Sequence, residues 1–126
     1  MINWEQLRDT IVAGASISPI STSACEIIRR QHAGIPEDYL LFLSEIGWGE
    51  FETLQLFSGP TPAPDIYGPR GHLGKIILIG DDYQGYCFGF AAPAGFAMVE
   101  ITPAGEARFL NKSFVDFMLS RTTSTQ

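Results

Sequence analysis

Hydrophobic residues in the first part of the chain recur at the spacing of an α-helix. Trp4, Leu7 and Ile11 are three and four residues apart. Asn3 precedes them and Gln6 follows it by three residues, which is the pattern of a helix N-terminus. We therefore expect a short amphipathic helix in this segment.

A second helix is predicted further on. Ser23 and Glu26 form a capping-box pattern before the apolar positions Ile27 and Ile28. Gly34 is of a residue type that commonly ends helices, because glycine adopts the left-handed conformation without steric cost. This helix is expected to end at that glycine.

The segment 35–47, "IPEDYLLFLSEIG", carries the clearest helical pattern of the chain. Pro36 fits the first turn, where its missing N–H has no helical acceptor to lose. Glu37 and Asp38 place negative charge at the positive end of the helix dipole, and Gly47 is suited to end the helix. The apolar residues of this segment share one helix face: Tyr39, Phe42, Leu43 and Ile46.

After Gly49 the pattern changes to short runs of aromatic and branched residues, bounded by Gly, Pro, Asp or Asn. Such runs are expected to be strands, and they occupy 51–57, 75–80, 85–90, 96–101 and 106–110. Short turns join most of them, and a parallel pair needs a crossover of about a dozen residues. The strands are therefore expected to be antiparallel.

The segment 112–121, "KSFVDFMLSR", returns to a helical pattern, with Ser113 as a cap and Asp116 three residues later. Helices, then strands, then one helix is the order of an α+β fold. We predict N-terminal helices, a mostly antiparallel sheet of about five to six strands, and a C-terminal helix packed on one face. Residues 122–126 are expected to form a disordered tail.

The composition is typical of one compact domain, which we place at residues 1–121. The chain has 126 residues, 45% of them hydrophobic, and this length buries a core without disulfides or metals. Its net charge of −6 argues against direct nucleic-acid binding, which needs a basic face. No apolar run reaches the roughly 20 residues of a membrane span, and no export signal is visible. We expect a cytoplasmic protein with two buried free thiols, Cys25 and Cys87.

The stretch 79–90, "IGDDYQGYCFGF", has to be weighed as a possible active site. Asp81 and Asp82 are neighbours that would point to opposite faces of an extended strand, so they suit a catalytic carboxylate pair poorly. A calcium loop starting at Asp81 needs a glutamate at its twelfth position, where Ala92 stands. The glycines lead into a strand, whereas a phosphate loop leads into a helix. A turn remains, followed by a strand whose aromatic residues face the helices and whose small residues face the other side.

No other catalytic or metal-binding pattern was found. His32 and His72 stand without paired cysteines and form no zinc pattern. The chain contains no Walker loop, no G-x-S-x-G elbow and no H-E-x-x-H motif. Cys87 has no histidine near it in the sequence to lower its pKa. We therefore predict a protein without enzymatic activity, cofactor or metal ion.

The segment 58–74, "SGPTPAPDIYGPRGHLG", is longer than connections in compact domains usually are. Prolines stiffen it, and Tyr67 and Arg70 are side chains that binding surfaces favour. A binding loop and a plain surface connection fit this segment equally well.

Three motifs in order resemble those of the SUKH superfamily, the Smi/Knr-type domains. "IPEDYLLFLSEIGWGEF" resembles its first signature, a proline-containing helix start, an aromatic–Leu pair and a glycine-centred helix end. "ILIGDDYQGYCFGF" is similar to its second signature, and "KSFVDFMLSR" to its closing helix. The similarity covers roughly residues 20–121.

This resemblance implies an α+β binding domain without catalytic activity. Bacterial members are similar to immunity proteins that bind and neutralise a cognate toxin, often a nuclease, and eukaryotic relatives act as regulators and adaptors. We expect an immunity protein whose negative groups meet a basic toxin surface. The alternative is an intracellular regulatory or scaffold domain that binds a host protein. In either case a monomer or weak homodimer is expected.

The expected partner-binding residues follow the third helix, lie in the 58–74 segment or form the Asp-Asp-Tyr turn. They are Trp48, Glu50, Tyr67, Arg70, Asp81, Asp82 and Tyr83. Trp48 fits a core position equally well, and the two aspartates also fit a purely local role in the turn.

Overall fold

The computed structural model describes residues 3–11, 16–68 and 71–122. These residues form the α-helices α1 Trp4–Ile11, α2 Thr22–Gln31, α3 Glu37–Glu45, α4 Pro64–Tyr67 and α5 Phe114–Thr122. They form the strands β1 Ser16–Ser18, β2 Trp48–Glu50, β3 Gln55–Pro62, β4 Ile76–Asp81, β5 Cys87–Ala91, β6 Ala97–Ile101 and β7 Ala107–Phe109. Two short 3₁₀ helices are η1 Gly71–Leu73 and η2 Ala92–Ala94. Among the described residues, every helix is too short or too polar to span a lipid bilayer.

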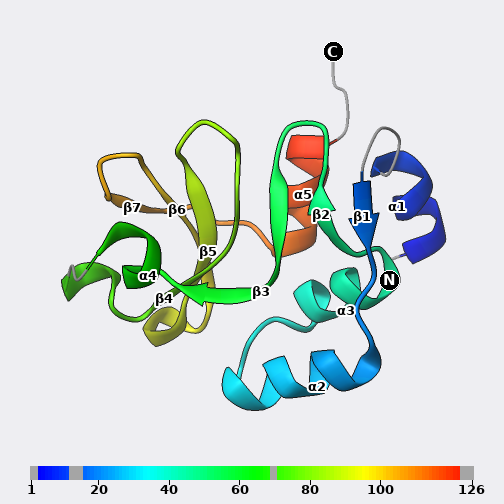
Figure 1. Cartoon of the computed structure of the whole chain (residues 1–126), viewed down its shortest axis with the longest axis horizontal. Coiled ribbons are helices and arrows are strands. Elements are labelled where there is room, and N and C mark those ends of the chain that lie inside the picture. Colours follow the sequence, from blue (N-terminus) through cyan, green and yellow to red (C-terminus); the bar gives the residue numbers. More distant parts are fainter. Residues whose placement is uncertain (1–2, 12–15, 69–70, 123–126) are drawn as a thin grey trace.

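The seven strands of the described residues form one sheet in chain order, β1 to β7, and each strand is antiparallel to the next (Figure 1). The α+β class with a C-terminal helix packed on the sheet is therefore confirmed. The sheet also contains β1 and β2, which the sequence did not predict. Each has three residues, too few to show an alternating pattern.

The main hydrophobic core lies between one face of the sheet and the helices α1, α2, α3 and α5. Tyr39 of α3 contacts Phe90 of β5 and Phe114 of α5, with ring centroids 5.5 and 5.2 Å apart. Phe88 of β5 contacts Phe117 of α5 at 4.6 Å. These edge-on and tilted pairs are favourable arrangements for aromatic rings. The aromatic residues of β5 thus face the helices, as predicted.

A second, smaller core covers the opposite face of the sheet. Its buried members are Ala63, Leu73, Ile76, Leu78, Cys87, Ala91, Val99 and Ile101. The proline-rich segment supplies its outer wall, because β3 continues to Pro62 and α4 and η1 follow. In Figure 1, α4 lies at the end of the molecule away from α1. The expectation that 58–74 is one long loop was therefore wrong, because its described residues include the end of β3, α4 and η1.

The predicted strand 51–57 is divided in the structure. Residues 51–54 form the β2–β3 turn, in which the Phe51 N–H donates to the Leu54 carbonyl at 2.8 Å, and β3 begins at Gln55. The register of β3 against β4 shifts between Leu56 and Thr61. This irregularity divides β3: its first part pairs with both β2 and β4, and its second part, which belongs to the proline-rich segment, pairs with β4.

The helix starts agree with the sequence in part. The Asn3 side chain accepts a hydrogen bond from the Gln6 N–H at 3.0 Å, as its position predicted. At α2 the cap is Ser21, which accepts from the Ala24 N–H at 3.1 Å. The predicted cap, Ser23, lies inside the helix, because Ser21 already satisfies an N–H of the first turn.

The later helices differ by single residues from expectation. Pro36 is the N-cap of α3 and precedes its first turn. Ser113 caps α5 by accepting from the Asp116 N–H at 3.1 Å, as predicted. α5 continues to Thr122, which was expected to begin the tail, and residues 123–126 lie outside the described ranges.

Candidate functional site

Three hairpin turns lie side by side at one end of the sheet. Because consecutive strands are antiparallel, the β2–β3, β4–β5 and β6–β7 turns emerge at the same end. The Tyr83 hydroxyl donates to the Phe51 carbonyl at 3.3 Å, which joins the first two turns. A Cβ atom at Gly85 would lie 3.2 Å from Pro103 Cγ, so the second and third turns are in contact. We call residues 51–54, 82–86 and 102–106 the turn edge.

Tyr83 is the exposed aromatic residue of the turn edge. Its φ angle is +67°, in the left-handed region that bulky residues rarely adopt. The Asp81 carboxylate accepts from its N–H at 3.0 Å, and its side chain is 48% exposed. Partial burial, together with the Glu50 and Asp81 carboxylates, raises the pKa of the Tyr83 hydroxyl. The backbone conformation at Tyr83 is thus unfavourable, and it leaves the ring half-exposed beside two acidic groups.

The carboxylates of Asp81 and Asp82 are both used to hold the β4–β5 turn. Asp81 accepts from Gln55 Nε2 on β3 at 3.0 Å as well as from the Tyr83 N–H. Asp82 accepts from the Gln84 and Tyr86 N–H groups at 2.8 and 3.1 Å. These are the local bonds by which aspartates stabilise turns. The two carboxylates therefore have different hydrogen-bond partners.

Glu50 and Trp48 of β2 lie on the same face of the sheet as Asp81. Glu50 is opposite Gln55 on β3, and Gln55 is opposite Asp81 on β4. Residues in such a cross-strand row point to one side of a sheet, and a residue two positions away on the same strand points to that side too. Trp48 lies two positions before Glu50 on β2, and it is 37% exposed. The structure therefore brings four predicted contact residues together at one corner: Trp48, Glu50, Asp81 and Tyr83.

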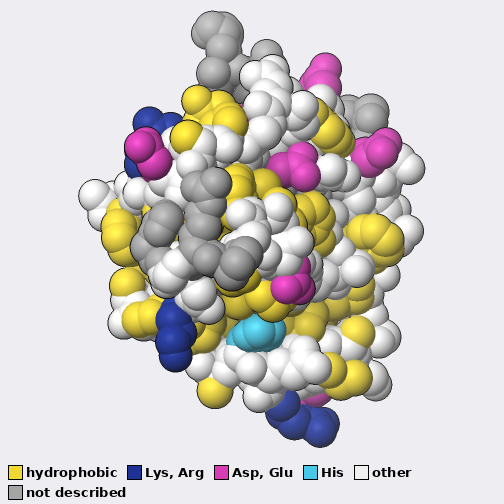
Figure 2. Space-filling model, turned by 60° about the vertical axis from the view of Figure 1, so that its left-hand side comes forward, with side chains coloured by type: hydrophobic (Ala, Val, Ile, Leu, Met, Phe, Trp, Pro, Cys, Tyr) yellow, Lys and Arg dark blue, Asp and Glu magenta, His cyan; other side chains and the backbone are white. Residues whose placement is uncertain are grey.

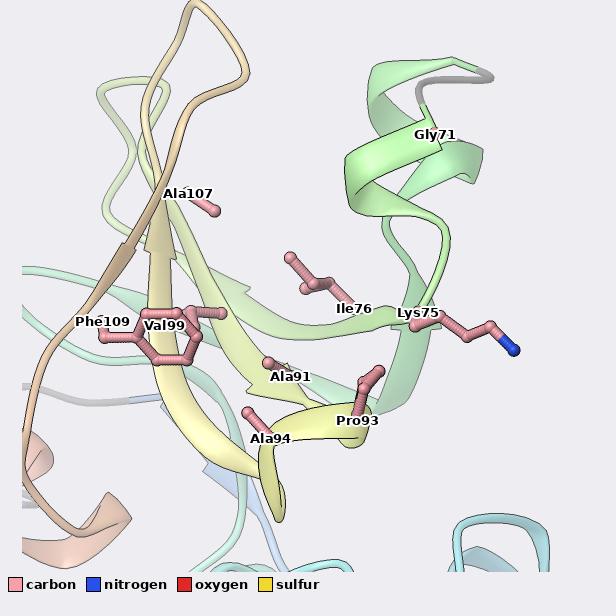
Figure 3. A pocket seen from close by; sticks show the side chains of 9 residues that line it. All are labelled: Gly71, Lys75, Ile76, Ala91, Pro93, Ala94, Val99, Ala107 and Phe109. Carbon is pink, nitrogen blue, oxygen red and sulfur yellow. The ribbon is translucent and has the colours of Figure 1, made fainter.

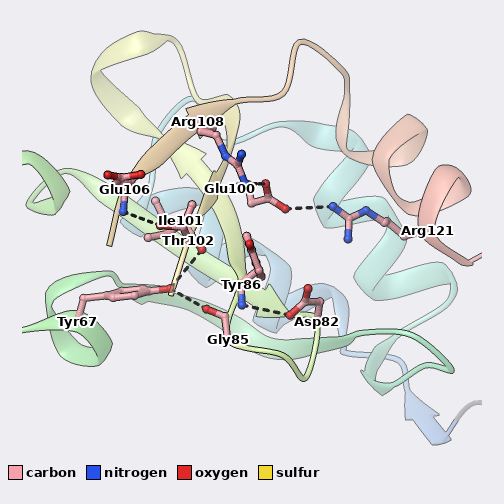
Figure 4. A network of polar contacts seen from close by, with 10 residues as sticks. All are labelled: Tyr67, Asp82, Gly85, Tyr86, Glu100, Ile101, Thr102, Glu106, Arg108 and Arg121. Atoms are coloured by element: carbon pink, nitrogen blue, oxygen red, sulfur yellow. Dashed lines mark hydrogen bonds and ion pairs between the residues drawn. The ribbon is translucent and has the colours of Figure 1, made fainter. Parts of the chain in front are cut away.

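Tyr67 lies on the same side but has a structural position. Its hydroxyl donates toward the carbonyls of Ile101 and Gly85, at 3.4 and 3.5 Å (Figure 4). It also contacts the Cys87 thiol. Burial raises the pKa of this phenol well above its ordinary value, and the contact with Cys87 adds to the shift. Tyr67 thereby attaches α4 to the sheet beneath the β4–β5 turn. Arg70, the remaining predicted contact residue, lies outside the described residues.

A charged cluster on the helix side of the turn edge was not predicted. Glu100 of β6 pairs with Arg108 of β7 at 3.0 Å and with Arg121 of α5 at 3.1 Å (Figure 4). The Arg108 guanidinium lies over the Tyr86 ring, 5.9 Å from its centroid. The sequence indicates this cluster only through Glu100, the charged residue in the otherwise apolar run "FAMVEI".

An apolar groove opens between η1, η2 and the strands β4 to β7 (Figure 3). Its volume is about 330 Å³. It is lined by Gly71, Lys75, Ile76, Ala91, Pro93, Ala94, Val99, Ala107 and Phe109. Sequence reasoning missed this groove, because its walls come from four separate segments that are adjacent only in the fold.

A second hollow, of about 280 Å³, lies between α2 and α3. Its lining includes Cys25, whose thiol donates to the Leu40 carbonyl at 3.5 Å, and Arg29. Arg29 is paired with Glu26 and with Glu37, so its charge is already neutralised within the helices. Across the described ranges, no group of three or more His, Cys, Asp or Glu side chains is placed to hold a metal ion.

The exposed surface near the turn edge mixes apolar and acidic groups. Figure 2 views the molecule from the side on which α4 and β7 lie. Hydrophobic side chains are spread over this face, and most of the acidic ones in view lie in its upper half, where the turns are in Figure 1. Basic side chains lie toward the margins.

Comparison with known proteins gives little to add to this geometry. No protein-family model matches the chain, and no solved structure matches it. A UDP-glucose 4-epimerase of Neisseria gonorrhoeae is similar, with 25% identity over 101 residues. The match covers 80% of this chain and 29% of the epimerase. The chain thus spans less than a third of the length of that relative, and the likeness assigns it to no family.

Proposed function

We propose that this chain is a non-enzymatic binding protein that recognises its partner through the turn edge and the neighbouring corner of β2. Its resemblance to the SUKH superfamily favours an immunity protein as the specific function. It acts in the cytoplasm and blocks a toxin by covering it. It contacts protein, without direct contact to nucleic acid or membrane.

The observation that carries this proposal is the conformation of Tyr83. A left-handed backbone costs an L-residue about 1–2 kcal/mol, and glycine at this position would remove that cost. Strained residues are concentrated at sites of function, where the strain serves to aim a side chain. Here it presents an exposed ring between Glu50 and Asp81. A rigid aromatic side chain beside charges is a common centre of binding energy.

The charge of the chain supports a basic partner. The sequence has 14 acidic and 8 basic residues, and Glu50, Glu52 and Glu106 are exposed at or beside the turn edge. Opposite charges on two proteins accelerate their association and lose this effect as salt screens them. The proposed complex should therefore form more slowly at high ionic strength.

The hydrogen bonds of the two aspartates favour binding over catalysis at this site. Each carboxylate already accepts two or more bonds from its own turn or from Gln55. Neither is placed opposite the other across a gap in which a substrate would react. The role of the pair is to fix the turn that carries Tyr83.

The decisive experiment is co-expression with the toxin whose gene adjoins that of this chain. We expect growth to be rescued and the two proteins to co-purify. Tyr83→Gly and Glu50→Gln should weaken the complex at least tenfold by titration calorimetry. Glu5→Gln, an exposed change on α1, is the matched control and should leave the affinity unchanged. Undiminished toxicity, or a complex that tolerates both turn-edge variants, would count against the proposal.

A further inference from the structure

The outer edge of β7 carries unpaired backbone groups. β7 is the last strand of the described sheet, and β6 is its neighbour on the other side. The Thr102 N–H donates to the Glu106 carbonyl at 2.9 Å, and the Leu110 N–H donates to the Met98 carbonyl at 3.1 Å. Bonded pairs alternate along an antiparallel ladder, so between these two lies the bonded pair of Glu100 and Arg108.

The residues between the bonded positions therefore direct their backbone outward. They are Ala107 and Phe109, and their N–H and C=O groups point away from β6. The hydrogen bonds of the described residues give these groups no other backbone partner. Two donors and two acceptors are thus offered in a row at the edge of the sheet, at the spacing that another strand matches.

The side chains of the same two residues line the apolar groove. Ala107 and Phe109 form its wall on the β7 side, opposite Gly71 of η1 and the η2 residues Pro93 and Ala94 (Figure 3). Phe109 is 59% exposed. An exposed phenylalanine beside an apolar groove is typical of a surface that binds a partner. A strand added beside β7 would direct every second side chain to this face of the sheet.

We propose that β7 binds an extended peptide segment of another protein as an eighth strand. Backbone bonds to Ala107 and Phe109 hold the peptide, and an apolar side chain of the peptide enters the groove. This is strand addition, in which main-chain bonds give affinity and pockets for alternate side chains give specificity. The free edge and the groove are independent features, and both are built from the same strand.

The charge at the groove specifies the peptide further. Lys75 is the charged residue of the lining, and no acidic residue is part of that lining. Its ammonium group points away from the hollow at the rim (Figure 3), and no carboxylate pairs with it in the described part of the chain. In a chain of net charge −6 this is a local reversal of sign. The peptide should therefore carry an acidic residue next to its apolar one.

The test is selection from a phage-displayed library of random dodecapeptides on the whole immobilised chain. We expect enrichment of sequences with apolar residues at alternate positions and a neighbouring acidic residue. A fluorescein-labelled copy of the enriched peptide should bind in fluorescence anisotropy. N-methylation of alternate amides on the edge that pairs with β7 should abolish binding, and methylation on the other edge should not.

Variants of β7 complete the test. Ala107→Pro removes an outward N–H that the sheet does not use, and Ala107→Phe fills the groove without altering the backbone. Both should raise the Kd at least tenfold. Arg108→Ala, on the same strand but facing the other way, is the control and should bind as the parent does.

Several results would overturn this inference. They are a selection without a consensus, a consensus lacking the alternation, and binding by both Ala107 variants that is as tight as binding by the parent chain. Concentration-dependent dimerisation that Ala107→Pro abolishes would assign the edge to a second copy of the chain and would also overturn it. Because these variants leave Tyr83 and Glu50 intact, the outcome is separate from that of the proposed toxin binding.

Discussion

The steric cost of the left-handed backbone at Tyr83 can be measured with two substitutions of this one residue. Tyr83→Ala and Tyr83→Gly both remove the ring and its hydrogen bond to the Phe51 carbonyl. They differ in the steric cost of φ +67°, which alanine keeps and glycine loses. We expect the glycine variant to have a free energy of unfolding about 1 kcal/mol higher than the alanine variant, by urea denaturation. Equal stability of the two variants would mean that the turn relaxes around the substituted residue.

Tyr39 carries a polar atom that the fold leaves unsatisfied. Its hydroxyl is buried and has no hydrogen-bond partner among the described residues, and burial keeps its pKa far above the ordinary value. A buried donor without a partner is destabilising, so Tyr39→Phe should raise the free energy of unfolding by about 1 kcal/mol. Tyr67→Phe is the comparison, because that hydroxyl has the Ile101 and Gly85 carbonyls as acceptors. It should lower stability, and opposite signs in chemical denaturation are the expected result.

At the scale of elements, strong local signals were read correctly from the sequence. The helical spacing at 35–47 and the cap at Ser113 depend on neighbouring residues alone, and the structure contains both. The weak predictions were those that depend on distant partners. β1 becomes a strand because it pairs with β2, and its three residues carry no pattern of their own. The same holds for β2, which pairs with β1 and β3.

The first turn of α3 also caps α5, a contact between elements that the sequence did not indicate. The Asp38 carboxylate accepts from the Val115 N–H at 3.2 Å. Asp38→Ala should therefore lower the free energy of unfolding by about 1 kcal/mol, since it removes a cap. Glu37→Ala is a matched control, because it removes an acidic residue from the same turn. Glu37 pairs only at the surface, with Arg29, so its loss should be smaller. Equal losses would show that the helix dipole, and not the cap, accounts for the effect.

At the scale of the whole molecule, the candidate site depends on register. Sequence reasoning selected Trp48 and Glu50 from one segment and Asp81 and Tyr83 from another, without a means to place them together. They meet because Gln55 pairs with Glu50 on one side and with Asp81 on the other. That register depends on the start of β3, which the sequence placed four residues too early, at Phe51. The groove was beyond sequence reasoning for the same reason, because its walls assemble only in the folded sheet.

The two faces of the sheet are covered so differently that they should open independently. Four helices cover one face, whereas α4 and η1 cover the other with few residues. Cys25 lies in the helical layer and Cys87 lies under the proline-rich segment, and both are buried free thiols. Burial raises the pKa of each thiol, so neither should react rapidly in the native state. Cys87 thus reports the opening of the second face, and Cys25 reports the separation of α2 from α3 within the helical layer.

Leu73→Ala should separate the two openings. Leu73 is fully buried against the second face, and truncating a buried leucine costs about 2–5 kcal/mol. If that cost mainly destabilises the packing of α4 and η1 on the sheet, modification of Cys87 by a thiol reagent should accelerate roughly tenfold or more. Cys25 should stay slow in the same sample, as mass spectrometry of the labelled peptides would show. Equal acceleration at both cysteines would mean that the sheet and its two covers unfold as one unit.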